Sequence, residues 1–462
     1  MNGSQTAWMP WSKAAAFRLK AGDLGKLHDS FSDLTMSDGF HPRESRCGLG
    51  GGEKMKSHLL LGTALLASWV SASITLPRAW MTYNPDDSIK KEKFRGETRY
   101  LTWMADSQIK RGVAPTNAYT TSAFYSGVML AYNRTGDAKY LDYVNRQIDM
   151  LLYPAWDGSI VLYNGSNSID DIRIGHSFLD IYEATGKDIY LQAAQLLKDQ
   201  IDSSRRTAAG GFFHRYPDYV NQMWLDGIYM LDVFYARWAS KFEHGNTTAW
   251  DDIANQYDLI DAGTTSHRAT LGLPVHGFDF SKRAVWADPV TGAAPHVWSR
   301  AVGWYIMALV DTLDYFPASH PGRARLLRYL QSVADAVVAA QDPRTKGWWV
   351  VMTPGWEGKP GNYVESTGTS MFVYGLLKAR RLGYIKGGRY KRSALQGYAL
   401  MTETFVSEAE PHGGVDLDWA VQTGSLSSNG TFEYYVSIPI FQNDLKGVAP
   451  FMFAAFEYEL QM

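Results

Sequence analysis

Asp226 lies in a strongly apolar helical stretch and is the first candidate for chemistry. Residues 221–238 read Asn-Gln-Met-Trp-Leu-Asp-Gly-Ile-Tyr-Met-Leu-Asp-Val-Phe-Tyr-Ala-Arg-Trp, which predicts a helix that is apolar on nearly every side and therefore buried. A carboxylate there costs several kcal/mol unless it is paired, hydrogen-bonded or protonated. It is either a catalytic group or a residue that caps the helix or faces a polar seam. Asp232 points about 240° away around the helix, so only one of the two can face a given cavity.

Arg300 and Trp304 form a second candidate group, at the start of another apolar helix. They are four positions apart within residues 296–305 and share one helix face. A guanidinium beside an indole can hold a planar carboxylate through two hydrogen bonds while the ring stacks on the ligand. The alternative is a structural arginine that packs on tryptophan and pairs with an internal acid.

An acidic pair and a histidine complete the candidates. Asp170 and Asp171 stand at a predicted helix start, where capping of the helix and its dipole explains them as well as catalysis does. His276 lies in a loop without Cys or Glu at metal-ligand spacing, so we expect no metal and no other cofactor. The sequence contains no Gly-x-Ser-x-Gly motif and no phosphate-binding glycine-rich loop. Carboxylates, His, Arg, Tyr and Trp suit acid–base chemistry on a sugar.

Composition narrows the possible partners. A formal net charge of -2 and a pI near 6.6 give no electrostatic footprint for nucleic acid. The aromatic share is 14%, with 16 Trp and 27 Tyr; flat aromatic rings are surfaces on which sugars stack, but large cores use them equally. We expect an oligosaccharide partner and no nucleic acid. The oligomeric state is not predicted, and a monomer is assumed.

The elements that must position these residues are helical hairpins. The pair Thr135-Gly136 lies between two apolar helices, and the pair Tyr140-Leu141 lies at the start of the second one. Both pairs recur about 50 residues later, at 185–186 and 190–191. Such a period indicates stacked hairpins whose apolar faces pack on their neighbours. Three further helical hairpins fit the same scheme with less regular spacing: 223–242 with 250–259, 304–315 with 323–341, and 370–381 with 392–406.

A last helix at 448–460 is expected to pair with one near 97–112, which closes six hairpins. We therefore predict an all-α protein, an (α/α)6 barrel with twelve helices in two concentric rings, formed by one domain over residues 73–462. The connections after Ile201, Gly263, Gln341 and Ser407 are rich in Gly, Pro and aromatic residues. We expect these connections to gather at one end and build the site.

The N-terminal part carries a targeting pattern. Residues 1–54 are polar, have no helical or strand period and are expected to be a disordered extension upstream of a true start at Met55. Residues 55–72 have a basic start, an apolar run of about 12 residues and small residues at Val70 and Ala72. This predicts a signal peptide that is too short to span a membrane, with a short signal anchor as the alternative.

Four glycosylation sequons accord with the secretory route, at Asn133, Asn164, Asn246 and Asn429. We expect a secreted glycoprotein without stable membrane insertion. Cys47 is the single cysteine and precedes the predicted mature start, so no disulfide is expected.

Four motifs in order resemble those of the unsaturated rhamnogalacturonyl hydrolases, glycoside hydrolase family 105. They are residues 223–230, 298–304, 365–372, and 434–435 followed by 443–448. The resemblance covers nearly everything from about residue 95 to the C-terminus. It implies an (α/α)6 barrel and the removal of an unsaturated uronic acid, left by pectin lyases, from the non-reducing end of short oligosaccharides.

The resemblance also assigns site residues. The family's catalytic aspartate falls on Asp226 of Trp224-Leu225-Asp226, and its second aspartate falls on Asp170 or Asp171. Its substrate-binding residues fall on the following side chains: Trp224, His276, Trp298, Arg300, Trp304 and Thr369. Ala301-Val302 stands where many members have Gly-Asn, which leaves the exact substrate open.

The resulting hypothesis is hydration of the substrate's C4=C5 bond. Asp226, kept protonated by an apolar setting that includes Trp224, donates a proton to C4, and water adds at C5. Arg300 and His276 hold the uronate carboxylate, while Trp298 and Trp304 stack on the ring. Two rivals are another (α/α)6 carbohydrate enzyme, such as a mannanase or a lyase, and a non-catalytic glycan-binding toroid.

Overall fold

The computed structural model describes residues 93–94, 97–155, 157, 159–162, 168–265, 270–409 and 413–462. All of them belong to the second of the two units into which the chain divides, Leu76–Met462. The predicted extension at 1–54, the predicted signal peptide at 55–72, Cys47 and the sequon at Asn164 lie outside the described residues.

Helices dominate the described part of the chain. The long ones are α1 (Tyr100–Arg111), α2 (Tyr119–Thr135), α3 (Ala138–Asp149), α4 (Gly175–Thr185), α5 (Asp188–Ser203), α7 (Val233–Phe242), α8 (Thr247–Thr264), α9 (Ser299–Tyr315), α10 (Pro321–Ala339), α11 (Ser366–Arg381), α12 (Gly388–Leu400) and α14 (Leu445–Glu459). The short helices are α6 (Leu225–Gly227) and α13 (Phe432–Ser437), with a 3₁₀ helix at Ile169–Ile174 and π turns at Ile228–Asp232 and Met401–Phe405.

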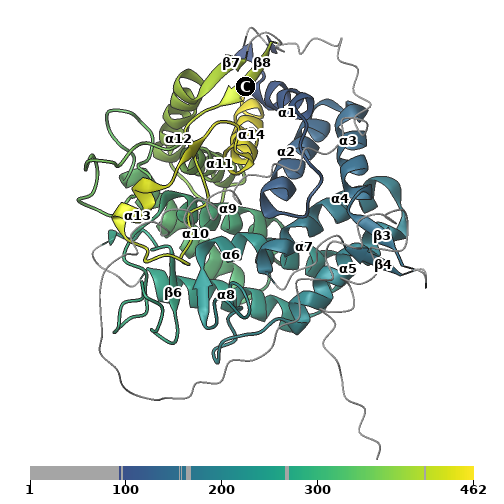
Figure 1. Cartoon of the computed structure of the whole chain (residues 1–462), viewed down its shortest axis with the longest axis horizontal. Helices are drawn as coiled ribbons and strands as arrows, with labels where there is room; N and C mark the ends of the chain where they lie inside the picture. Colours follow the sequence, from purple (N-terminus) through teal and green to yellow (C-terminus); the bar gives the residue numbers. More distant parts are fainter. Residues whose placement is uncertain are drawn as a thin grey trace, which may run out of the picture. The chain divides into compact units, whose positions relative to one another are not determined.

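These helices pack as six hairpins. Helix α2 contacts α3, α4 contacts α5, α7 contacts α8, α9 contacts α10, and α11 contacts α12. The first and last helices, α1 and α14, lie side by side although they are at opposite ends of the described chain (Figure 1). Contacts from α14 to α2, from α11 to α14 and from α9 to α11 join the inner helices. The predicted (α/α)6 barrel and its closing pair are confirmed.

The inner helices are buried nearly all round, which is why their sequences lack a polar face. In α9 the run from Ser299 to Val310 is buried without interruption. A Cβ atom on Gly303 would come within 2.4 Å of the Met371 sulfur of α11, so glycine permits the close approach of these two helices. No helix of the described ranges is long and apolar enough to cross a membrane.

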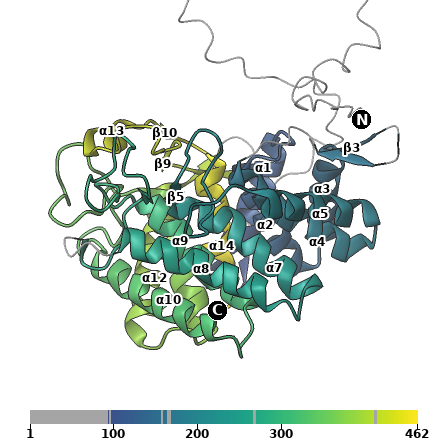
Figure 2. The same cartoon turned by 90° about the horizontal axis from the view of Figure 1, so that it is seen from below.

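Short antiparallel strand pairs connect the helices. They are β1 (Lys93–Phe94) with β2 (Glu97–Thr98), β3 (Leu152–Pro154) with β4 (Ile160–Leu162), β5 (Gln222–Trp224) with β6 (Gly277–Asp279), β7 (Val406–Ala409) with β8 (Gly414–Leu417), and β9 (Ala420–Val421) with β10 (Ile440–Phe441). Figure 2 shows β5, β9, β10 and α13 on one side of the helices. The connections after Ile201 and Ser407, which carry these four elements, therefore lie at the same end, as the sequence predicts for them.

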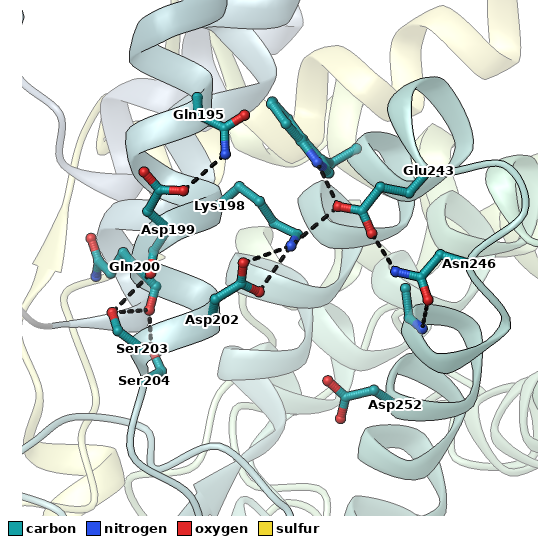
Figure 3. A network of polar contacts seen from close by, with 12 residues as sticks. Gln195, Lys198, Asp199, Gln200, Asp202, Ser203, Ser204, Glu243, Asn246 and Asp252 are labelled. Atoms are coloured by element: carbon teal, nitrogen blue, oxygen red, sulfur yellow. Dashed lines mark hydrogen bonds and ion pairs between the residues drawn. The ribbon is translucent and has the colours of Figure 1, made fainter.

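One polar network fastens the outer helix α5 to the turn between α7 and α8 (Figure 3). Lys198 of α5 lies 3.2 Å from Glu243, whose carboxylate also accepts hydrogen bonds from Trp238 Nε1 at 3.0 Å and Asn246 Nδ2 at 2.7 Å. Asn246 caps the first turn of α8 as well. The side chain of this sequon asparagine therefore has a structural role.

Candidate active site

Asp226 lies in the first turn of an inner helix that begins later than predicted. The expected helix start at Asn221 is wrong, because Asn221 adopts a left-handed backbone with φ of 63° and the next three residues form strand β5. The helix begins at Leu225, passes through the π turn Ile228–Asp232 and continues as α7. Its first turn is where the helix dipole favours an anion.

Pairing of β5 with β6 brings His276 to Asp226. Trp224 lies opposite Gly277, and the Leu225 backbone N–H donates to the His276 carbonyl at 3.0 Å. A Cβ atom on Gly277 would come within 2.7 Å of the Met223 carbonyl, so this register needs glycine. The pairing is non-local, which is why the sequence alone did not indicate a strand here.

The result is a buried chain of three polar side chains. Oδ2 of Asp226 lies 3.1 Å from Nε2 of His276. Nδ1 of the same imidazole lies 2.7 Å from the Tyr435 hydroxyl. The His276 side chain is fully buried, whereas that of Asp226 is 15% exposed. Asp226 is therefore the member of the chain that a ligand can reach.

The electrostatics of Asp226 correct one expectation. Burial raises the pKa of this carboxyl, but attraction to His276 and a hydrogen bond with it, aided by His214, outweigh burial and leave the pKa below its ordinary value. An Asp226 kept protonated by apolar surroundings is therefore wrong for this arrangement. The carboxylate is ionised beside an imidazole.

Asp170, one member of the acidic pair, has contacts that reach this site. Its Oδ1 lies 3.8 Å from Nε2 of His214, and its Oδ2 lies 3.1 Å from the Arg215 guanidinium. His214 in turn stacks on Trp224, with ring centroids 4.1 Å apart. Burial lowers the pKa of His214 despite the nearby carboxylates, so the imidazole is neutral at pH 7. The two carboxylates, Asp170 and Asp226, thus flank one neutral ring.

Sequence reasoning missed three residues of this site. His214 sits in the connection after Ile201, and its neighbours Phe213 and Arg215 make the aromatic and basic pattern that could have singled it out. Tyr435 was within a quoted motif but had no role. Tyr119, at the start of α2, is half-buried with its ring 6.2 Å from that of Trp304. Burial raises the pKa of Tyr119, and Asp170 and Asp226 are among the charges that act on it.

Arg300 is buried and has partners within the protein. It is 1% exposed, its Nη1 donates to the Gln422 carbonyl at 3.0 Å and its Nη2 donates to the Val421 carbonyl. The Glu365 carboxylate lies 3.5 Å away, and the guanidinium lies 5.1 Å from the centre of the Trp298 ring. These contacts tie β9 to the start of α11, as the structural alternative expects. The expected grip on a uronate carboxylate stays a prediction.

The remaining predicted binding residues are also buried. Trp298 and Trp304 are each 1% exposed, and they stack on Tyr435 at 5.6 Å and on Tyr229 at 4.8 Å. Thr369 is fully buried in α11. The expectations that the two indoles stack on a sugar, that Thr369 binds it and that His276 holds a substrate carboxylate stay predictions. In this structure the fully buried His276 contacts Asp226.

No three His, Cys, Asp or Glu side chains of the described segments come together as a group that could hold a metal ion. The arrangement offers instead two carboxylates, a neutral imidazole and an Asp–His–Tyr chain at one end of a helical barrel. The class that this fold and site define is an (α/α)6 enzyme with acid–base chemistry.

Comparison with known proteins gives the family. Residues 97–462 match the model of Glycosyl Hydrolase Family 88, and the chain belongs to this family. A solved glycoside hydrolase of family 105 from C. acetobutylicum is 35% identical, with a TM-score of 0.73 over 78% of this chain and 99% of that one. The predicted relationship to family 105 is confirmed, and the protein is a glycosidase.

Two further relatives have named activities. The unsaturated rhamnogalacturonyl hydrolase YesR of Bacillus subtilis is 25% identical over 56% of this chain and 70% of its own length. The unsaturated glucuronyl hydrolase of Bacillus sp. GL1 shares the fold at 14% identity, with a TM-score of 0.57 over 78% of this chain and 95% of that one.

Proposed function

We propose that this protein removes an unsaturated uronic acid from the non-reducing end of pectin-derived oligosaccharides, specifically rhamnogalacturonan fragments. The observation that carries the proposal is the 3.1 Å contact between Asp226 and His276 in the first turn of an inner helix. The activity named for YesR supports the substrate class. The names of both relatives support an unsaturated uronyl group as the residue removed.

The reaction is a hydration of the substrate's C4=C5 vinyl ether. A proton adds to C4, the cation at C5 is stabilised by the ring oxygen, and water adds to C5 and loses its proton to the carboxylate that gave up the first. The C5 hemiketal then opens, and the freed oxygen at C1 lets the leaving sugar depart as an alcohol. This sequence needs one group that acts first as acid and then as base, and Asp226 fills both roles.

Entry of the substrate explains how an ionised Asp226 can act as an acid. A uronate carboxylate that enters beside Asp226 and His276 adds negative charge and excludes water, and both effects raise the proton affinity of Asp226. His276 positions Asp226, and the Tyr435 hydroxyl keeps the imidazole in place.

Asp170 and Arg215 serve the substrate from the opposite side of His214. The Arg215 side chain is 39% exposed, so it retains solvent access that Arg300 lacks. We assign it the contact with the substrate's carboxylate. Asp170 then orients Arg215 and contributes negative charge that stabilises the cation at C5.

The test is an absorbance assay on lyase-digested rhamnogalacturonan. Hydration destroys the conjugated double bond, so the ultraviolet band of the unsaturated uronate should disappear with wild-type protein. Unsaturated disaccharides from homogalacturonan and from glycosaminoglycans, assayed side by side, rank the substrates. Persistence of the band on every substrate would refute the function, and faster turnover of a glycosaminoglycan disaccharide would refute the pectin assignment.

The protein is also proposed to be secreted, on the strength of the signal-peptide pattern at 55–72. N-terminal sequencing of protein from a native secretory host should begin near Ser73. Sequence upstream of Met55 in the secreted protein would contradict this and make residues 1–54 part of the mature chain.

A further inference from the structure

A strongly basic segment lies at the end of α11 remote from Asp226. Residues 378–392 contain seven Lys or Arg and no Asp or Glu, in a chain whose formal net charge is -2. The seven are Lys378, Arg380, Arg381, Lys386, Arg389, Lys391 and Arg392. Protein surfaces usually intersperse both signs, so a one-signed segment of this length calls for an explanation.

Three of the seven cations are neutralised within the fold. Lys378 lies 2.6 Å from Asp311, Arg381 lies 2.7 Å from Glu457, and Arg389 pairs with Asp335. Within the described ranges, the other four are exposed and have no carboxylate within 4.0 Å: Arg380, Lys386, Lys391 and Arg392. The structure therefore separates cations that hold helices together from cations that are free for a ligand.

Three of the free cations line one depression in the surface. Arg380 comes from the end of α11, and Lys391 and Arg392 come from α12, which lies on the outside of the helices (Figure 1). The depression measures about 490 Å³, and its other walls include Leu395 and the Gln396 side chain. Cationic walls, an apolar patch and a neutral amide together fit a carboxylate-bearing sugar, which has an anionic group, apolar C–H faces and hydroxyls.

This surface is separate from the site around Asp226. Helix α11 has 16 residues, roughly 24 Å at 1.5 Å per residue. Glu365, which contacts Arg300 and Val421 near the site, precedes its first residue. Arg380 stands one residue before its end. A ligand in the depression therefore cannot be the residue that Asp226 acts on.

We propose that this depression, defined by Arg380, Lys391 and Arg392, is a second carbohydrate site that binds the uronate units of an acidic polysaccharide. The preference of the depression for anions follows from its three exposed cations. The choice of a polyuronate as the ligand rests on the proposed function. Holding the polymer raises the local concentration of chain ends that lyases generate around the enzyme. Nucleic acid fits less well, because the cations do not form a long track and the chain as a whole is weakly acidic.

The experiment measures binding of polygalacturonate by affinity gel electrophoresis, with the triple variant Arg380→Ala, Lys391→Ala and Arg392→Ala. Loss of three contacts should weaken binding by about tenfold or more and reduce its salt dependence. Turnover of an unsaturated disaccharide, which is too short to use both sites, should stay at the wild-type rate. That second readout tests the proposed function separately.

A matched control removes three other exposed cations, through Lys187→Ala, Arg328→Ala and Arg344→Ala. This control should bind polygalacturonate as wild type does. If both triple variants lose binding of polygalacturonate equally, the loss follows from net charge alone and the proposal is overturned. Wild-type protein that does not bind polygalacturonate would also overturn it, as would DNA that competes as well as the polysaccharide does. Thermal melts establish that each variant is folded.

Discussion

Asp226 and Asp232 stand six residues apart on one inner helix, and their surroundings shift their pKa values in opposite directions. Asp226 is partly exposed and sits beside His276, which leaves its pKa below the ordinary value. Asp232 is 2% exposed, and burial, reinforced by Asp252, raises its pKa well above the ordinary value. A buried carboxylate in an apolar helix is thus reactive only where the fold supplies a titratable partner and a route to solvent.

The two cations Arg215 and Arg300 repeat the same contrast. Arg300 has the sequence context expected of an anion-binding residue, yet its guanidinium is committed to two backbone carbonyls and Glu365. Arg215 lies in an irregular connection and keeps solvent access beside Asp170. In both pairs, accessibility and partners distinguish a functional group from a structural one, and residue type does not.

The largest expected effect comes from Asp226→Asn. The amide cannot pass a proton to C4, so kcat should fall by roughly 10²–10⁴-fold while the melting temperature changes little. Asp232→Asn is the matched control, since it makes the same change on the same helix away from His276. It should keep near wild-type kcat in the absorbance assay. Similar losses of kcat in both variants would remove the distinction between the two carboxylates.

Arg300→Lys separates a structural arginine from a binding one. Lysine cannot reach two carbonyls and Glu365 with one ammonium, so the free energy of unfolding should fall by about 1–3 kcal/mol. KM should stay near the wild-type value. Denaturant unfolding and steady-state kinetics measure the two quantities, with the exposed Arg328→Lys as control. A raised KM at unchanged stability would instead show that Arg300 binds the substrate.

Asp232 should make stability pH-dependent in a defined direction. Its pKa is raised in the folded state, so its contribution to the free energy of unfolding is fully present below the ordinary pKa of 3.8. That contribution is lost as the pH rises from 3.8 toward the folded-state pKa. Between these two pKa values, the free energy of unfolding of Asp232→Asn should rise relative to that of wild type by up to about 1.4 kcal/mol per pH unit. Urea unfolding at pH 4, 5 and 6 measures the difference. A constant difference across the three pH values would contradict the assignment.

The smallest effect is expected from Tyr435→Phe. This change removes one hydrogen bond to Nδ1 of His276 and leaves the aromatic packing, so kcat should fall by a factor that corresponds to about 0.5–1.5 kcal/mol. Tyr434→Phe is the neighbouring control, because its hydroxyl accepts a hydrogen bond from the Ser425 backbone instead. If the control lowers kcat as much as Tyr435→Phe does, the Tyr435 hydroxyl has no special part in the pair.

The helical hairpins and their number follow from local sequence patterns. The repeat of Thr-Gly and Tyr-Leu pairs, and the apolar inner helices, are local patterns of helix period and turn residues, and the structure places α2–α3 and α4–α5 where they predict. Asp226, His276 and the pair Asp170-Asp171 could also be singled out, because unusual polar residues in apolar or loop settings are visible without coordinates. The choice between Asp170 and Asp171 could not be made from the sequence. Strand β5 could not be predicted either, since it exists only by pairing with β6, more than 50 residues later.

The partners and the burial of each candidate residue became visible only with the folded chain. Arg300 finds its acceptors at 421 and 422, and His276 finds Tyr435, across more than 100 residues in each case. Side-chain exposure, ion-pair partners and the direction of a pKa shift all depend on such contacts, and a local pattern does not record them. Residue type therefore set the candidate list, while burial and long-range partners divided it into side chains with solvent access and side chains enclosed in the barrel.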